Sequence, residues 1–337
     1  MTDVDRDLPV LGIETSCDET AAAVVIGGRE VRSSVVSSQV DVHARYGGVV
    51  PEIASRAHVE LLTPVIAEAL VEGGVPDDDI GAVAATYGPG LIGALLVGVA
   101  TAKAMALVWD VPFVAVNHLE AHLHAALLDD PDVELPVVVL LVSGGHTLLV
   151  EMDAPGSYRV LGGTVDDAAG EAFDKVARYL GLGYPGGPAI DRVSADGDPE
   201  AIAFPRAMLD EGLDLSFSGL KTAVINHCRR HPDASTVDVA ASFQAAVVDV
   251  LVAKALRAAE ATGAKGVCLG GGVAANSLLR RRMTEAGGAA GLAVSLPSRE
   301  MCTDNAAMVA AAGWYRLRAE GPSPLDTGAV PGLGLSV

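Results

Sequence analysis

Apolar and polar positions alternate in two similar series along the chain. In the first series, short runs rich in β-branched residues predict strands, and the first two strands form a hairpin. Apolar positions that repeat with a helical period predict the helices between them. The predicted elements are strands at residues 8–15, 20–26 and 30–40, a helix at 51–72, a strand at 80–87 and a helix at 91–109.

The second series repeats this order of three strands, helix, strand and helix. A segment rich in Gly, Pro and Phe interrupts it, and we expect that segment to be an irregular insert at 181–222. The predicted elements are strands at 135–142, 147–152 and 158–165, a helix at 167–180, a helix at 237–262, a strand at 266–269 and a helix from about 274.

Each copy of the unit carries small-residue turns between its elements. In the second copy these are Ser143-Gly144-Gly145-His146 and Gly270-Gly271-Gly272. Small turn residues let backbone N–H groups approach phosphate oxygens, and a following helix N-terminus adds a favourable dipole. A duplicated βββαβα unit of this kind predicts an α/β protein with the two-lobed actin, Hsp70 and sugar-kinase (ASKHA) fold. The expected division is lobe I at 1–113, completed by 320–337, and lobe II at 114–319.

Composition and charge limit the functions that the chain can have. It has 337 residues, half of them apolar, which is enough for two compact lobes and excludes a disordered protein. Its 23 basic and 43 acidic residues give a net charge of −20. That balance argues against coating nucleic acid or anionic membrane by bulk charge, so any such contact needs a local basic patch or a partner. The densest basic run is Arg280, Arg281 and Arg282, which either contacts phosphates or balances an acidic chain.

Cysteine spacing and apolar runs bear on location. Cys17, Cys228, Cys268 and Cys302 contain no Cys-x-x-Cys pair, so the pattern indicates neither a zinc ribbon nor a disulfide framework. The first residues have no basic and apolar signal pattern, and we expect a cytoplasmic protein. The apolar run at 91–109 is long enough to raise the question of a membrane span, but its neighbours favour a buried helix and no membrane partner.

Two histidines have the spacing of a metal-ligand pair. His118 and His122 lie four residues apart in the opening turns of a predicted helix, so both imidazoles leave one face. Spacing alone fits a solvated helix face equally well. Asp304 is the candidate third ligand, and a set of two imidazoles and one carboxylate suits Fe(II) or Zn(II) better than Mg(II). His124 and Glu120 should point away from the pair.

Longer motifs extend through nearly the whole chain and resemble those of one family, the bacterial TsaD (YgjD, Gcp) tRNA N6-adenosine threonylcarbamoyltransferases. The motifs are Gly12-Ile-Glu-Thr-Ser-Cys-Asp-Glu-Thr20, the segment from His43 to His58, Asn117-His-Leu-Glu-Ala-His122, Leu141-Val-Ser-Gly-Gly-His-Thr147, the segment from Asp166 to Lys175, Tyr184-Pro-Gly-Gly-Pro188 and Ser216-Phe-Ser-Gly-Leu-Lys-Thr222.

This resemblance implies transfer of a threonylcarbamoyl group from threonylcarbamoyl-adenylate to N6 of the adenosine 3′ of the anticodon (t6A formation), in tRNAs reading codons that begin with A, with release of AMP. It also implies a smaller paralogue, TsaB, and an ATPase, TsaE, as partners. It implies one divalent metal ion, usually iron, at His118, His122 and Asp304. Contacts to the adenylate are implied for Leu141, Val142, Ser143, Gly144, Gly145, Asp174, Gly187, Asp191 and Asn276.

Several of these residues have a structural alternative. Asp174 and Asp191 can accept hydrogen bonds from ribose hydroxyls, but Asp174 can also pair with Arg178 one turn later. Asn276 is either a helix cap or a contact to the base edge. His146 either contacts the substrate or supports its own turn.

The donor is a mixed anhydride that is already activated, so the enzyme must mainly orient substrates and stabilise charge. Acidic residues of the first hairpin, Glu14 and Asp18 with the adjacent Glu19, are candidates for accepting the proton of the attacking amine. A solvated acidic turn is the alternative.

Three other functions fit parts of the pattern less well. A small-molecule kinase of the same fold would not need His118, His122 and Asp304. A zincin peptidase requires His-Glu-x-x-His, whereas this chain has His-x-Glu-x-His. A scaffold has no use for both glycine turns and a ligand set.

Overall fold

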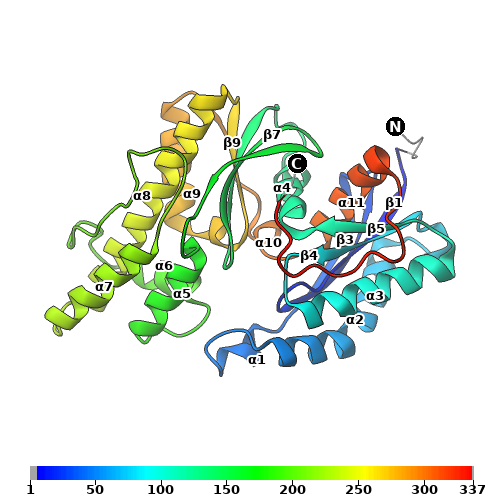
Figure 1. Cartoon of the computed structure of the whole chain (residues 1–337), viewed down its shortest axis with the longest axis horizontal. Coiled ribbons are helices and arrows are strands. Elements are labelled where there is room, and N and C mark those ends of the chain that lie inside the picture. Colours follow the sequence, from blue (N-terminus) through cyan, green and yellow to red (C-terminus); the bar gives the residue numbers. More distant parts are fainter. Residues whose placement is uncertain (1–5, 336–337) are drawn as a thin grey trace. The chain divides into compact units, whose positions relative to one another are not determined.

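The computed structural model describes residues 6–335 and shows two compact units, each built on a mixed five-stranded sheet (Figure 1). The first unit contains the chain up to Asp132 and again from Thr303 onward, and the second is Val133–Cys302. This division differs from the expected one, because residues 114–132 and 303–319 belong to the first unit. Helices formed by these two segments pack against each other and against the first sheet.

The first sheet has the order β3-β2-β1-β4-β5. Its first three strands are antiparallel neighbours, while β4 runs parallel to β1 and β5 parallel to β4. The strands are β1 (Pro9–Glu14), β2 (Glu19–Ile26), β3 (Glu30–Ser38), β4 (Ala82–Gly88) and β5 (Phe113–Asn117).

Helices cover both faces of this sheet. Alternate residues of β1 point to opposite faces. Leu11 and Ile13 join the apolar core shared with α2 (Pro51–Gly73) and α3 (Ile92–Trp109). Gly12 faces α11 (Ala306–Glu320) on the other side, and α11 packs against all five strands. The remaining helices of this unit are α1 (Val40–Ala44), the short η1 (Asp77–Asp79) and α4 (His118–Asp129).

The segment after α11 returns along β4 and β5. The backbone N–H of Ser323 donates to the carbonyl of Phe113 at 2.8 Å, and that of Val330 donates to the carbonyl of Tyr87 at 2.7 Å. Lys103 Nζ donates to the carbonyl of Thr327. The chain end is therefore an integral part of the first unit.

The second sheet has the order β10-β9-β6-β7-β8, with the same mixture of antiparallel and parallel pairs. The strands are β6 (Val137–Val142), β7 (Thr147–Ala154), β8 (Ser157–Gly163), β9 (Gly266–Gly270) and β10 (Ala293–Ser295). The helices are α5 (Ala169–Tyr179), α6 (Gly186–Ser194), α7 (Ser218–Arg230), α8 (Thr236–Thr262), η2 (Gly272–Ala275), α9 (Ser277–Ala289) and α10 (Arg299–Cys302). The matching strand orders confirm the predicted duplication and fold class.

The long helix α8 is the centre of the second core. Phe243 of α8 meets Phe173 of α5 edge to face, with ring centroids 5.3 Å apart. Val138 and Leu140 of β6 belong to the same buried cluster. The face of the second sheet and the helices α5 and α8 therefore share one apolar core.

Three details differ from the sequence-based expectations. The segment 181–222 is not irregular throughout, because it contains α6 and the first residues of α7. The strands β5 and β10 and the helix α11 were not predicted. The helix at 91–109 was expected to be buried, but α3 buries only part of its surface and exposes Leu107 and Val108. Both α3 and α8 are long and apolar enough to cross a membrane, and α8 is mostly buried in the protein.

Gly12→Ala should destabilise the first unit by about 1–3 kcal/mol, since a Cβ at Gly12 would lie 2.2 Å from the carbonyl oxygen of Ala306 in α11. Both tryptophans, Trp109 and Trp314, lie in this unit, so urea unfolding followed by tryptophan fluorescence measures it. Gly328→Ala is the control, because a Cβ there meets no atom within 4 Å. Equal midpoints for the two variants would contradict the close packing of β1 and α11.

Candidate metal centre and nucleotide site

Two histidines enter the candidate metal centre from the first turns of α4. Asn117 ends β5 and caps the helix, with its side-chain oxygen accepting a hydrogen bond from Leu119 N at 2.8 Å. His118 is therefore the first residue of α4, and His122 follows one turn later. Both side chains are buried, and the ring centroids lie 4.8 Å apart. The predicted helix and the shared face of the two imidazoles are both present.

The third residue comes from the far end of the chain. Asp304 precedes Asn305, which caps α11 by accepting a hydrogen bond from Met308 N at 3.1 Å. Asp304 Oδ1 lies 3.1 Å from His122 Nε2 and 3.5 Å from His118 Nε2. One ligand atom from each of the three residues lies within 4.8 Å of the other two. The three predicted ligands thus converge within one unit.

The donor set fits a divalent transition metal ion. Two neutral imidazoles and a carboxylate are common ligands of Fe(II) and Zn(II). His118 Nδ1 lies 3.0 Å from Glu14 Oε2, which leaves Nε2 directed toward Asp304 and available to an ion. A carboxylate behind a ligating histidine is the usual support of such sites.

Charges in the centre are strongly coupled. Burial lowers the pKa of His118, but the carboxylates of Asp304 and Glu14 outweigh it and raise that pKa to about 9. Burial raises the pKa of Glu14, but His118 outweighs burial and holds that pKa below its usual value. Burial, Asp304 and Asp18 together raise the pKa of Glu19 to about 9. The centre therefore concentrates negative charge where a cation is expected.

The two candidate proton acceptors lie in different surroundings. Glu14 is fully buried, and its Oε1 accepts a hydrogen bond from Ser16 N at 2.5 Å. Its Oε2 accepts one from Thr86 Oγ1 at 2.7 Å and faces His118. Asp18 is 8% exposed and follows Cys17 at the end of the β1–β2 turn. Both oxygens of Glu14 are thus engaged within the protein.

Glu120 and His124 point away from the centre, as expected. Glu120 forms an ion pair of 3.0 Å with Arg316, which links α4 to α11. His124 lies in the core and stacks on Tyr315 at 5.0 Å between ring centroids. Burial lowers the pKa of His124 to about 4. Neither residue is a ligand in this arrangement.

The predicted nucleotide-binding residues gather at one edge of the second sheet. In the β6–β7 turn, Ser143 N donates to the carbonyl of His146 at 2.8 Å, and His146 N donates to Ser143 Oγ at 3.1 Å. Leu141 of β6 pairs with Gly270 of β9, so the ends of these two strands are neighbours. Gly271 has φ +83°, and a Cβ there would lie 2.6 Å from the carbonyl oxygen of Val142. The two glycine turns therefore lie side by side.

The starts of α5 and α6 adjoin these turns. A Cβ at Gly170 of α5 would lie 2.5 Å from the carbonyl oxygen of Ser143, so glycine permits this approach. Asp174 Oδ1 accepts a hydrogen bond of 2.7 Å from Gly186 N, which holds the start of α6. In contrast, a Cβ would meet no atom within 4 Å at four glycines, which are Gly144, Gly145, Gly187 and Gly272. These positions leave room for a ligand against the backbone.

Asp191 and Asn276 act at the start of α9. Asp191 accepts hydrogen bonds from Ser277 Oγ at 2.7 Å and from Ser277 N at 3.1 Å. Asn276 Oδ1 caps α9 at Leu279 N, and its Nδ2 donates to Gln244 at 2.8 Å. The side chain of Asn276 therefore makes the hydrogen bond of a helix cap, which was one of the two roles expected for it.

Sequence reasoning missed several supporting residues. Thr86 and Ser277 hydrogen-bond to carboxylates that were predicted, and Gly170 and Gly186 allow close approaches. The two glycines stand inside motifs that were recognised, beside Glu171 and Gly187. Thr86 gives no signal of its own, since it is one residue of an apolar strand.

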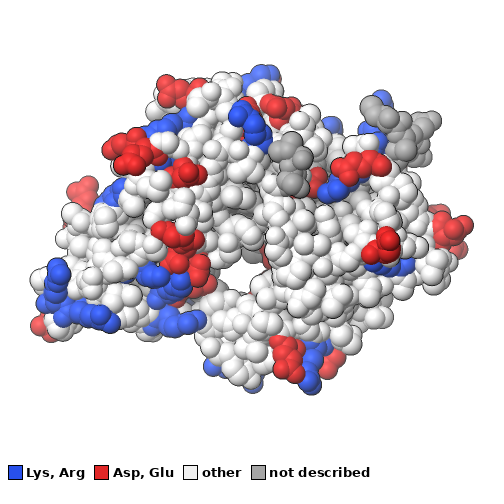
Figure 2. All heavy atoms as spheres, viewed as in Figure 1, with Lys and Arg blue, Asp and Glu red and all other residues white. Residues whose placement is uncertain are grey.

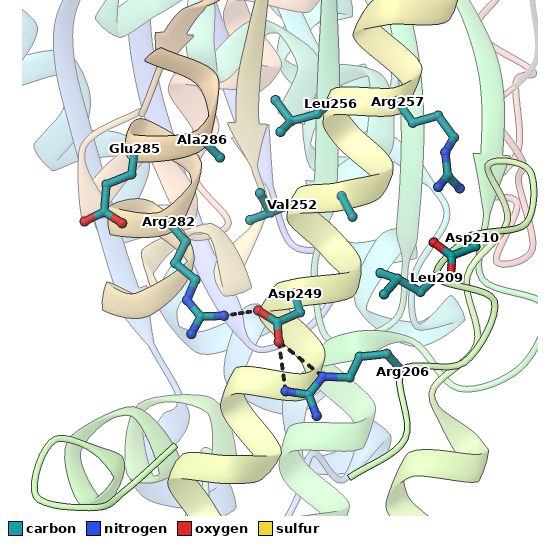
Figure 3. A pocket seen from close by; sticks show the side chains of 11 residues that line it. Arg206, Leu209, Asp210, Asp249, Val252, Leu256, Arg257, Arg282, Glu285 and Ala286 are labelled. Atoms are coloured by element: carbon teal, nitrogen blue, oxygen red, sulfur yellow. Dashed lines mark hydrogen bonds and ion pairs between the residues drawn. The ribbon is translucent and has the colours of Figure 1, made fainter. Parts of the chain in front are cut away.

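The basic run Arg280, Arg281 and Arg282 lies on α9, and most of it makes contacts within the second unit. Arg280 donates to the carbonyl of Pro297 at 2.8 Å, while Arg281 is exposed. Arg282 and Arg206 converge on Asp249 at the wall of a pocket of about 670 Å³ (Figure 3). Two of the three arginines therefore have a structural partner.

Solved structures with the same fold include proteins of other functions. HypF in its phosphate- and nucleotide-bound form aligns with a TM-score of 0.64 at 16% identity, over 95% of this chain and 48% of HypF. Component A of (R)-2-hydroxyglutaryl-CoA dehydratase from Acidaminococcus fermentans aligns with a TM-score of 0.54 at 15% identity, over 92% of this chain and 99% of that chain. These likenesses support the ASKHA-like two-lobed fold alone.

Sequence comparisons are far closer. The family model TsaD, described as tRNA N6-adenosine threonylcarbamoyltransferase, matches residues 30–311. The enzyme of that name from Symbiobacterium thermophilum is 56% identical over 331 residues, 97% of each chain. Its counterparts from Moorella thermoacetica, with 97% of each chain covered, and Desulfitobacterium hafniense, with 98% and 99%, are 54% and 53% identical. This chain belongs to the TsaD family of tRNA N6-adenosine threonylcarbamoyltransferases.

Proposed function

We propose that the chain transfers a threonylcarbamoyl group from threonylcarbamoyl-adenylate to N6 of the adenosine 3′ of the anticodon, in tRNAs reading codons that begin with A. The amine nitrogen attacks the carbamoyl carbon, the bond from that carbon to the phosphate oxygen breaks, AMP leaves and the amine loses a proton. The observation that carries this proposal is the pairing of a glycine-lined nucleotide site with a His, His, Asp centre in a member of this family.

The adenylate is assigned to the edge of the second sheet. Backbone groups from Leu141 to Gly145, together with Gly187, are suited to its phosphate and carbamate, because no side chain fills the space beside these glycines. Asp174 and Asp191 hold the starts of α6 and α9. These two carboxylates are assigned to the ribose hydroxyls, for which they are suitable acceptors. Asn276 holds the turn that contains Gly272 in place, because its side chain bonds to Leu279 N and to Gln244.

One divalent ion is assigned to His118, His122 and Asp304, with iron first and zinc as the alternative. When bound, the ion supplies positive charge that polarises a phosphate or carbamoyl oxygen. Glu14 fixes the orientation of His118 through Nδ1, because its oxygens have no free access to a substrate. Asp18 is therefore the better candidate for accepting the amine proton.

The family also supplies the proposed setting of the reaction. TsaB, a smaller paralogue, and TsaE, an ATPase, are the expected protein partners, tRNA is the acceptor substrate, and the cytoplasm is the expected location. A kinase activity has no support beyond the shared fold, since the buried histidine pair with Asp304 has no part in phosphoryl transfer assisted by Mg(II).

His122→Ala and Asp304→Asn should both lower bound metal. The first removes a ligand atom, and the second keeps the shape but loses the charge that attracts a divalent cation. Elemental analysis should give background metal for His122→Ala and a clear loss for Asp304→Asn. His231→Ala, at an exposed position of the second unit, should retain wild-type metal content. Wild-type metal content in both His122→Ala and Asp304→Asn would contradict the ligand assignment.

Gly187→Leu should weaken AMP binding by at least about tenfold, the factor that ~1.4 kcal/mol produces, because its side chain fills space assigned to the nucleotide. Gly219→Leu is a matched control. Each glycine is the second residue of its helix, and a Cβ at either meets no atom within 4 Å. Calorimetric titration with AMP tests this, and equal affinities for the two variants would remove Gly187 from the site.

Given threonylcarbamoyl-adenylate, metal, partner proteins and tRNA, the chain should release AMP and add threonylcarbamoyl to adenosine, as measured by mass spectrometry of the digested nucleosides. Guanosine at the acceptor position lacks the 6-amine, so transfer should stop. A small molecule phosphorylated from ATP, with no modified adenosine, would establish the kinase function instead.

A further inference from the structure

We propose that tRNA phosphates bind a basic surface on α5 and α7 of the second unit. This inference rests on the proposed function. The basic surface is defined here by Lys175, Arg178, Lys221, Arg229 and Arg230.

Charge along the chain is unevenly distributed. Residues 215–232 contain no Asp or Glu, although acidic residues outnumber basic ones by 43 to 23 in the whole chain. The same stretch carries Lys221, Arg229 and Arg230, together with two histidines. In Figure 2, blue side chains gather over α7 and α5 at the lower left. A local patch of this kind is what a chain of net charge −20 needs in order to bind a polyanion.

The arginines at the end of α7 are available to a ligand. Arg229 and Arg230 are exposed, and neither forms an ion pair with any residue in the described range 6–335. Many other basic side chains are already paired with an acid, as Arg159 is with Glu151 and Lys265 with Glu134. Free guanidinium groups form strong bidentate hydrogen bonds with phosphates.

A partly buried bridge of ion pairs joins the two helices of the surface. Asp167, just before α5, lies 2.9 Å from Lys175 Nζ and 2.6 Å from Lys221 Nζ. The two ammonium groups are therefore held next to each other, and one carboxylate does not neutralise both. Glu171 also pairs with Lys175 at 2.7 Å, so the free charge of the surface lies mainly toward Lys221 and the end of α7.

The α5 part of the surface lies beside residues assigned to the nucleotide. Helix α5 carries Lys175 directly after Asp174, which holds Gly186 at the start of α6. The same helix begins against the β6–β7 turn at Gly170. An acceptor adenosine must reach the carbamoyl group of the adenylate, so phosphate contacts beside α5 are in a useful place.

Aromatic rings border the end of α7. His227 and His231 have ring centroids 4.7 Å apart, and Phe204 meets His227 at 5.7 Å. With Arg230, the two histidines line a groove of about 510 Å³, to which Asp233 and Asp238 also contribute. Ring faces and guanidinium planes stack on unpaired bases, and carboxylates accept hydrogen bonds from base amino groups. The groove thus suits a nucleotide base better than a second phosphate.

A purely structural role for these arginines has a different consequence. Cations in the last turn of a helix interact favourably with its dipole. Their loss would therefore lower the stability of the fold without changing the affinity for tRNA. Arg281 and Arg299 are also exposed arginines of this unit, and neither forms an ion pair in the described part of the chain. They provide a control with the same change of charge.

The test compares Arg229→Glu/Arg230→Glu with Arg281→Glu/Arg299→Glu in the full-length chain. Fluorescence anisotropy with labelled tRNA, over a range of salt concentrations, gives the affinity and its salt slope. AMP titration and thermal melting report the nucleotide site and the fold. We expect the α7 variant to bind tRNA at least tenfold more weakly, with a salt slope reduced by about 2, and the control to stay within twofold of wild type.

Each outcome decides the proposal. Unchanged tRNA affinity in the α7 variant overturns it, and a loss confined to the control variant assigns tRNA to α9 and α10. A lower melting temperature with unchanged tRNA affinity supports the dipole role and also overturns it. If the α7 variant still binds tRNA but no longer retains TsaB or TsaE in a pull-down, the surface binds a protein partner and the proposal is overturned. Failure of wild type to modify tRNA in the complete reaction tests the proposed function separately, since anisotropy needs no turnover.

Discussion

The close packing of α11 on the first sheet is the constraint on which the metal centre depends. The chain leaves the first unit at Asp132 and returns at Thr303, so Asp304 reaches the histidines only if α11 seats correctly. Small residues permit this. A Cβ at Gly12 would overlap the backbone of α11, and one at Gly313 would lie 2.5 Å from Ala84 Cβ. Because the helix approaches this closely, the residue before its cap lies 3.1 Å from His122.

Electrostatic contacts and packing support each other where α4 and α11 meet the first sheet. The ion pair of Glu120 with Arg316 ties α4 to α11, and the hydrogen bonds of Glu14 tie His118 to β1 and β4. Isolated buried charges are costly, so each of these carboxylates has a cationic or hydrogen-bonding partner. Burial and repulsion from Asp304 and Asp18 nevertheless raise the pKa of Glu19 to about 9. A bound divalent cation would relieve that repulsion.

Sequence patterns predicted most strands and the long helices, but they missed elements that carry no clear signal of their own. The strands of both hairpins alternate or form short β-branched runs, and their matching order was foreseen. Helix α11 is rich in alanine and buried on most sides, so it shows no apolar stripe. Helix α6 begins with Gly186, Gly187 and Pro188, which indicate a loop in isolation but are tolerated in a first turn. The spacing of His118 and His122 predicted their shared face, whereas the environment of Glu14 depends on Thr86, which the sequence places 72 residues away.

The proposed nucleotide site illustrates how a chain with so many carboxylates could accept an anionic substrate. Asp174 and Asp191 each accept hydrogen bonds from the start of a helix, and these bonds hold the carboxylates in place. Positions without a side chain, such as Gly144 and Gly272, supply the free backbone instead. These carboxylates are thus tied to helix starts, and the surfaces proposed for phosphate consist of backbone and, on α7, of arginines that form no ion pair within residues 6–335. Net charge therefore says little about which anions the protein accepts, because local arrangement within about a Debye length decides the potential that a phosphate experiences.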